Sequence, residues 1–169
     1  MTGRIATMLA AMAIACGGLP ATALSGAGDV AQIKGLEARF ADAFNKKDVD
    51  AIMKVYVPGA GLFVFDVVPP RQYVGAAAYR KDWENFFAMF QGPVKFDISD
   101  LAVAADRNLA YSHSIQHLSG TGKDGKPIDL TVRVTDGYRK VGGHWLVALE
   151  HVSVPVDLAT LKPDTASKP

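Results

Sequence analysis

Apolar residues recur along the chain with two different spacings, and the change between them divides it into two halves. Over residues 30–44 they recur every three or four positions, which predicts a helix with one buried stripe, capped by Asp29. A second, shorter helix is predicted after Asp48, with Tyr56 on its apolar face. A third amphipathic helix is predicted over residues 79–90, where aromatic side chains share one face and Gly92 follows. Three helices therefore lead the fold.

The second half alternates with the two-residue period of strands. We expect strands over residues 94–104, 109–119, 128–139 and 144–154, separated by turn sequences rich in glycine, asparagine and aspartate. A short strand at 61–66 precedes the extended loop at Pro69-Pro70. Because the long strands follow one another without intervening helices, the pattern predicts an α+β domain with an antiparallel meander.

The two ends of the chain are set apart from this domain. Residues 1–23 combine a positive start, an apolar run and a small-residue cleavage pattern at Ala21-Thr22-Ala23, which predicts a signal peptide and a periplasmic or secreted protein. Two alternatives stay open: a buried N-terminal helix, and a lipoprotein anchored through Cys16. The mature domain then covers residues 24–154, and residues 155–169 form a polar tail over the surface.

Composition narrows the class of protein. Of 169 residues, 49% are hydrophobic and 21% charged, with a net charge of +1, which fits one globular domain. A nearly neutral chain has no overall field that attracts nucleic acid or an anionic bilayer, so we expect neither partner. The apolar run near the N-terminus is too short for a stable membrane span.

Several segments resemble a known family. Residues 65–75 lead into Tyr79-Arg80-Lys81-Asp82-Trp83, and the chain ends with residues 138–140, Trp145 and residues 150–155. These segments are similar to the SnoaL-like, ketosteroid-isomerase-homologue group of the nuclear-transport-factor-2-like superfamily. The resemblance covers the mature chain and implies a cone-shaped half-barrel, with three N-terminal helices packed on a curved antiparallel sheet. It also implies that Glu150 lies on the inner wall and that the outer sheet face forms a homodimer. The alternative is that the tail alone covers that face.

Side-chain alternation indicates which polar groups point into the cone. In the strand at 128–139, Val134 and Asp136 share the apolar face, which we expect to be the inner one. On the neighbouring strand we place His113 inward, with Ser112, Ser114 and Gln116 outward. His113, Asp136 and Glu150 would then form an acid–base group, or else a structural hydrogen-bond network. No metal-ligand spacing is present, so we expect no metal.

Asp66 is the second candidate for chemistry. By resemblance it occupies the position of the catalytic aspartate of ketosteroid isomerases, and the alternative is a loop-capping carboxylate. The oxyanion donors of those isomerases would fall near Phe40 and Val134, so the oxyanion hole is not reproduced. We expect the following residues to line a pocket: Tyr56, Tyr73, Trp83, Val134 and Val152.

Two functions follow from this sequence. In the first, the apolar pocket binds a small hydrophobic ligand without turning it over. In the second, the protein is a cofactor-free isomerase or cyclase that performs acid–base chemistry on a small carbonyl compound. The missing oxyanion donors favour the first. A third function, an oligomerisation module, has less support because no catalytic domain is attached.

Overall fold

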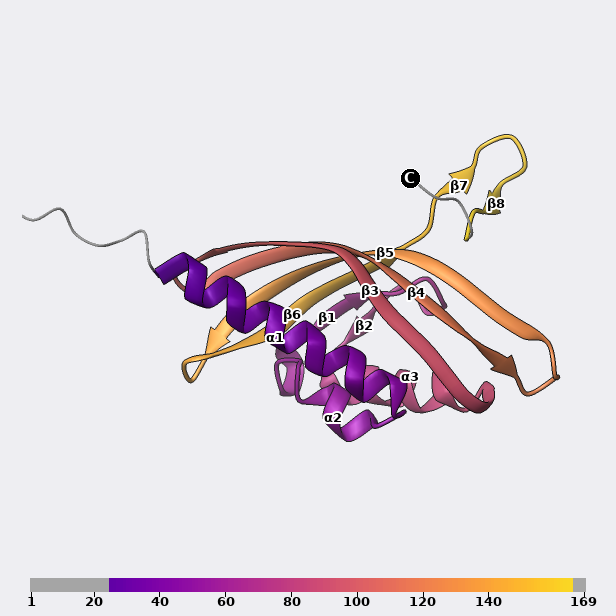
Figure 1. Cartoon of the computed structure of the whole chain (residues 1–169), viewed down its shortest axis with the longest axis horizontal. Helices are drawn as coiled ribbons and strands as arrows, with labels where there is room; N and C mark the ends of the chain where they lie inside the picture. Colours follow the sequence, from indigo (N-terminus) through magenta and orange to yellow (C-terminus); the bar gives the residue numbers. More distant parts are fainter. Residues whose placement is uncertain (1–24, 166–169) are drawn as a thin grey trace, which may run out of the picture.

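The fold is a curved sheet with three helices on its concave side (Figure 1). The structure is a computed structural model that describes residues 25–165. Its helices are α1 (Ser25–Asn45), α2 (Val49–Met53) and α3 (Ala76–Phe87), with one 3-10 turn, η1 (Gly59–Gly61). Its strands are β1 (Phe63–Phe65), β2 (Tyr73–Val74), β3 (Phe90–Asp106), β4 (Leu109–Gly122), β5 (Pro127–Val141), β6 (His144–Ser153), β7 (Val156–Asp157) and β8 (Lys162–Pro163).

Six strands form the main sheet in the order β2-β1-β6-β5-β4-β3. Strands β3 to β6 pair antiparallel, as the turn sequences predict. Strand β1 pairs with β6 in parallel, so the sheet is mixed. The α+β class is confirmed, and β1 brings the loop that follows it next to the end of β6.

Helix α1 is joined to the sheet by aromatic packing at its C-terminal end. Phe44 stacks on Phe96 of β3 with ring centroids 4.1 Å apart, and Phe40 contacts the same ring edge-on. The Asn45 amide donates to Phe96 O at 2.9 Å, and its oxygen accepts from Phe96 N at 2.8 Å. These contacts hold the C-terminal end of α1 against β3.

Two expected boundaries are wrong. Asp29 is not the cap of the first helix, which already begins at Ser25; its carboxylate accepts instead from Lys140 Nζ at 2.6 Å and Trp145 Nε1 at 2.9 Å. Phe90 does not belong to the third helix, because α3 ends at Phe87 and Phe90 begins β3. Local periodicity predicted neither boundary, because it carries no information on contacts between distant segments.

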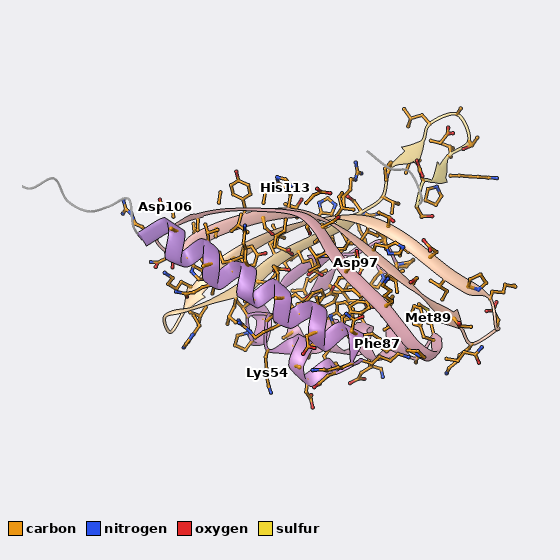
Figure 2. All side chains as sticks on the ribbon, in the orientation of Figure 1. Lys54, Phe87, Met89, Asp97, Asp106 and His113 are labelled. Atoms are coloured by element: carbon orange, nitrogen blue, oxygen red, sulfur yellow. The ribbon has the colours of Figure 1, made fainter. Side chains whose placement is uncertain are left out.

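Side-chain alternation along the strands is confirmed for β5 and wrong for β4. Val134, Asp136 and Tyr138 are buried on the concave side. On β4 the small polar residues Ser112, Ser114 and Gln116 are the buried ones, and His113 is exposed on the convex side (Figure 2). On β6 a bulge opposite Gly137 and Tyr138 changes the alternation, so that both Val147 and Glu150 are buried.

The ends of the chain are partly described. The predicted signal peptide, residues 1–23, lies outside the described residues. After β6 the tail forms a small hairpin, β7–β8, which projects from the domain with Leu158 and Leu161 exposed (Figure 1). Thr131 N donates to Thr165 O at 3.0 Å, so the tail returns to the edge of β5. Within residues 25–165, no helix combines the length and the apolarity that a membrane crossing requires.

Candidate ligand-binding site

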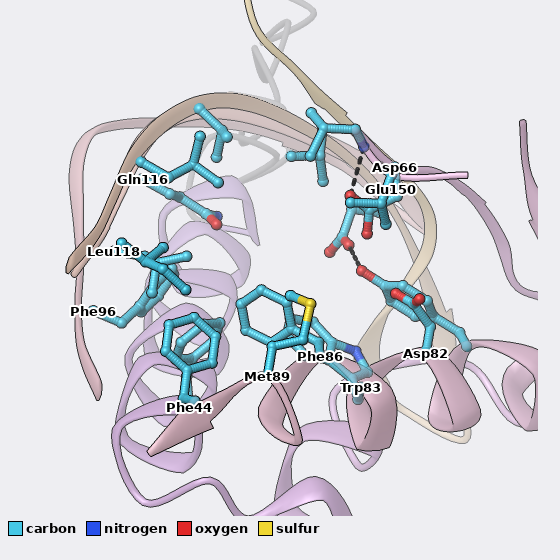
Figure 3. Close-up of a pocket in the computed structure, with 18 of the residues that line it drawn as sticks. Phe44, Asp66, Asp82, Trp83, Phe86, Met89, Phe96, Gln116, Leu118 and Glu150 are labelled. Carbon is cyan, nitrogen blue, oxygen red and sulfur yellow. Dashed lines mark hydrogen bonds between the residues drawn. The ribbon is translucent and has the colours of Figure 1, made fainter. Parts of the chain in front are cut away.

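A cavity of about 170 Å³ lies between α3 and the concave face of the sheet (Figure 3). Its volume is similar to that of an apolar protein cavity of about 150 Å³ that takes up benzene. Apolar and aromatic side chains form most of its wall, and Val67, Val68 and Met89 are exposed at its edge. Its lining includes Asp66, Tyr79, Asp82, Trp83, Val132, Glu150 and Val152.

One end of the cavity is polar and centres on Glu150 of β6. Tyr56 donates its hydroxyl hydrogen to Glu150 Oε2 at 2.8 Å, and Tyr79 donates to Oε1 in a short hydrogen bond. Burial raises the pKa of Glu150 to about 7, although the two tyrosine hydrogen bonds act in the opposite direction. The Asp66 carboxylate also raises this pKa by repulsion. Glu150 is therefore a carboxyl group that exchanges its proton near neutral pH.

Asp66 follows β1 and lies beside Glu150 at the same end of the cavity (Figure 3). Burial raises the pKa of Asp66 to about 6, even though Val67 N donates to its Oδ1 at 2.5 Å. We name Tyr56, Asp66, Tyr79 and Glu150 the open cluster, because three of its four members line the cavity.

Asp82 of α3 adds a third carboxyl group to the cavity wall. Tyr73 donates its hydroxyl hydrogen to Asp82 Oδ1 at 2.6 Å, and the same hydroxyl lies 3.1 Å from Pro69 O. Burial raises the pKa of Asp82, and the hydrogen bond from Tyr73 lowers it. Tyr73 thus connects α3 to the loop that carries Asp66.

Asp136 of β5, the neighbour of Glu150 on the sheet, is closed off from the cavity. The Tyr138 hydroxyl donates to Glu37 Oε1 at 2.7 Å and lies 2.7 Å from Ser112 Oγ and 3.4 Å from Asp136 Oδ2. Burial raises the pKa values of Asp136 and Glu37, and Glu150 raises that of Asp136 further. Asp136 Oδ1 has no hydrogen-bond partner within residues 25–165. We name Glu37, Ser112, Asp136 and Tyr138 the sealed cluster; none of the four lines the cavity.

The structure separates the residues that the sequence placed together. Asp66, Trp83, Glu150 and Val152 line the cavity. Tyr56 and Tyr73 lie behind it, where they bind Glu150 and Asp82, and Val134 and Asp136 are buried away from it. The inward placement of His113 is wrong: its neighbours Ser112 and Ser114 occupy the concave side, where Ser112 contacts Tyr138.

Six polar residues of the two clusters and the cavity wall were not singled out as site residues from the sequence: Glu37, Tyr79, Asp82, Ser112, Gln116 and Tyr138. Glu37 lies four residues from Ile33 and three from Phe40, so its position on the buried stripe was available in the helical period. Tyr79 and Asp82 are likewise three residues apart on one helix. The bond between Tyr79 and Glu150 spans 71 positions, and no local pattern predicts it.

The described residues offer no group of three or more histidine, cysteine, aspartate or glutamate side chains placed to hold a metal ion. The cavity instead combines apolar walls with an acidic end. Such an arrangement can bind an apolar molecule in one orientation, and its two carboxyl groups can take up or release a proton near neutral pH.

Solved structures of several other proteins are similar to this one. An NTF2-like protein of unknown function from Pseudomonas putida KT2440 is 31% identical, with a TM-score of 0.75 over 85% of this chain and 97% of that one. An NTF2-like superfamily protein from Salmonella enterica is 14% identical, with a TM-score of 0.70 over 78% of this chain and 94% of that one. A ketosteroid isomerase-like protein from Erwinia carotovora atroseptica is 19% identical, with a TM-score of 0.63 over 74% and 95%.

Curated proteins include none with significant sequence similarity to this chain. The family model for the SnoaL-like domain, in contrast, matches residues 33–157, which include all six strands of the main sheet and the whole cavity. The chain therefore belongs to the SnoaL-like domain family, within the NTF2-like superfamily.

Proposed function

We propose that the protein binds a small apolar molecule in the cavity between α3 and the sheet. The observation that carries this proposal is the cavity itself, which has room for a ring-sized molecule and walls formed mainly by apolar side chains. A buried apolar body with a few polar groups at one end is the usual form of a small-molecule site, because the apolar surface supplies affinity and the polar end fixes orientation.

Filling the cavity tests this proposal. Val132 lines the cavity, so Val132→Phe should place a ring inside it and abolish binding of benzyl alcohol, measured by calorimetry on the mature chain. The matched control is Val141→Phe on the same strand, where the side chain is exposed and binding should be unchanged. Native mass spectrometry of the purified protein should also show a retained small molecule. Equal binding of benzyl alcohol by both variants would contradict the proposal.

Acid–base catalysis is the second candidate, and one observation favours it. Asp66 and Glu150 lie at the same end of the cavity, with pKa values raised to about 6 and about 7. At neutral pH Asp66 is mostly ionised and Glu150 is about half protonated, so the first can accept a proton next to a carbonyl group while the second donates a hydrogen bond to the oxygen.

Hydrogen exchange tests this second candidate. The protein should speed the incorporation of solvent deuterium next to the carbonyl group of 1-indanone, as measured by NMR, with a rate that rises through pH 6 as Asp66 ionises. Asp66→Asn should remove the acceleration, whereas Asp50→Asn, in an exposed ion pair with Arg80, should keep it. Identical rates with and without protein would exclude this function for the ketone.

We also propose that the mature protein is an exported homodimer. The signal-peptide pattern of residues 1–23 supports export, and exposed apolar residues on the convex sheet face, including Tyr111 and Leu149, support a dimer through that face. N-terminal sequencing of protein from a native host should begin at Leu24. Leu149→Asp should convert the dimer to a monomer in analytical ultracentrifugation, and a monomeric parent protein would contradict the dimer.

A further inference from the structure

Every ionisable side chain in the cavity wall that carries a charge near neutral pH is acidic. Asp66, Asp82 and Glu150 line the cavity, and no lysine, arginine or histidine does so among the described residues. A cavity with this wall disfavours carboxylates and phosphates, because two buried negative charges close together repel each other.

The same carboxyl groups have room for more hydrogen-bond donors. Glu150 accepts from Tyr56 and Tyr79, Asp82 accepts from Tyr73, and Asp66 accepts from Val67 N. An ionised carboxylate offers about four acceptor positions, so each group can accept further hydrogen bonds. The cavity end can therefore accept further donors, and an ammonium group brings three of them.

Within residues 25–165, no positively charged side chain lines the cavity to compensate for the carboxyl groups. The ionisable groups that act on Glu150 or on its partners Tyr56 and Tyr79 include Glu37, Asp66 and Asp136. All of them are acids. Burial is the largest cause of the raised pKa values of Asp66 and Glu150, and repulsion from neighbouring carboxylates raises both further. A cation that enters the cavity would reverse this shift.

The aromatic wall is the second, independent observation. Trp83 of α3 lies in the wall of the cavity, only 8% exposed, and its Nε1 has no hydrogen-bond partner within residues 25–165 (Figure 3). A buried donor without a partner is rare in folded proteins, and Trp83 Nε1 can donate to the π face of an aromatic molecule bound in the cavity. The faces of Trp83 and Tyr79 also attract cations electrostatically.

We propose that the ligand is a small aromatic or similarly sized apolar amine, whose protonated amino group lies against Asp66 and Glu150 while its apolar body fills the cavity toward Trp83. This inference rests on the proposed binding function and deepens it by naming the class of ligand.

Three probes of nearly equal size separate this inference from the binding function on which it rests. Calorimetry at pH 8 would compare benzylamine, benzyl alcohol and benzoate, which carry a positive, a neutral and a negative group. We expect benzylamine to bind at least about tenfold more tightly than benzyl alcohol, and benzoate not to bind. If benzyl alcohol binds as tightly as benzylamine, the amine inference is wrong and the binding function remains. If none of the three binds, the binding function itself is contradicted.

Removal of one carboxylate locates the ammonium group. Asp66→Asn keeps the size of the side chain and should lower the affinity for benzylamine about tenfold or more while it leaves that for benzyl alcohol unchanged. Glu150→Gln should also lower the affinity for benzylamine. If Glu150→Gln does not fold, the result for Asp66→Asn decides. The matched control is Glu84→Gln on the same helix as Asp82, since Glu84 is exposed and pairs with Lys81. A full preference for benzylamine in Asp66→Asn would overturn the inference.

The pH dependence gives an independent readout. Below their pKa values of about 6 and about 7, Asp66 and Glu150 must lose protons before they can bind an ammonium group. The affinity for benzylamine should therefore rise from pH 5 to pH 8, by up to about tenfold per pH unit for each proton displaced. The affinity for benzyl alcohol should stay level, and a level profile for benzylamine as well would contradict the inference.

Discussion

The open cluster and the sealed cluster use the same residue types on the same sheet face, yet they differ in what they adjoin. Glu150 and Asp136 are direct neighbours on paired strands, both are buried, and both have tyrosine hydroxyls close by. Glu150 lines the cavity, whereas Asp136 is enclosed by Ser112, Tyr138 and Glu37. Burial and a raised pKa therefore do not by themselves mark a functional group, since a structural network has them too.

Loss of one tyrosine hydroxyl from each cluster should separate the two roles most strongly. Tyr138→Phe removes a hydroxyl shared by three polar side chains in a closed site, and should lower the free energy of unfolding by about 3 kcal/mol. Tyr79→Phe leaves Glu150 with Tyr56 and with access to the cavity, and should cost only about 1 kcal/mol. Urea denaturation of both variants measures the difference, and equal losses would mean that the clusters are not distinct.

Neutralisation of the sealed carboxyl group should stabilise the protein at high pH. Because the folded state raises the pKa of Asp136, the protonated carboxyl contributes stability at low pH that is lost as the pH rises through the folded value. Asp136→Asn cannot ionise, so it should gain about 2 kcal/mol over the parent protein at pH 8 and little at pH 4. Thermal unfolding across this pH range gives the comparison. A variant that is less stable than the parent at pH 8 would show that the Asp136 charge is compensated in the fold.

The smallest expected effect lies within the open cluster. Repulsion from Asp66 contributes to the raised pKa of Glu150, but burial is the larger cause. Asp66→Asn should therefore bring the pKa of Glu150 below about 7 while keeping it above its ordinary value, as measured by carbon-detected NMR of the carboxyl group. An unchanged titration would place the two side chains farther apart than the structure does.

Most helices and strands could be predicted from the sequence, but the buried face of β4 could not. The periods of three to four and of two were sufficient for α1, α3 and the meander β3–β6, because those elements are long and their apolar faces are regular. The faces of β4 were assigned wrongly because serine and glutamine were taken as outward-facing. In the structure these residues face the concave side, where Ser112 contacts Tyr138, whose hydroxyl donates to Glu37 of the distant helix α1.

The site was predicted only in part, because many of its contacts join residues that are far apart in the sequence. Asp66 and Glu150 were both found from the resemblance, and both line the cavity. Tyr56 was expected in the pocket, but the hydrogen bonds that Tyr56 and Tyr79 donate to Glu150 were not predicted, because they join residues 94 and 71 positions apart. The bulge in β6 that buries both Val147 and Glu150 is likewise set by its partner strand.

Chemical-shift mapping with benzyl alcohol tests most directly whether the cavity, and not the sealed cluster, is the functional site. Val132 and Val152 line the cavity. Val134 is buried on the same face of β5 as Val132 but does not line the cavity. Titration of methyl-labelled protein should shift the methyl signals of Val132 and Val152 in proportion to saturation and leave those of Val134 in place. Equal shifts at all three valines, or shifts confined to the convex face at Leu109 and Leu149, would contradict the account.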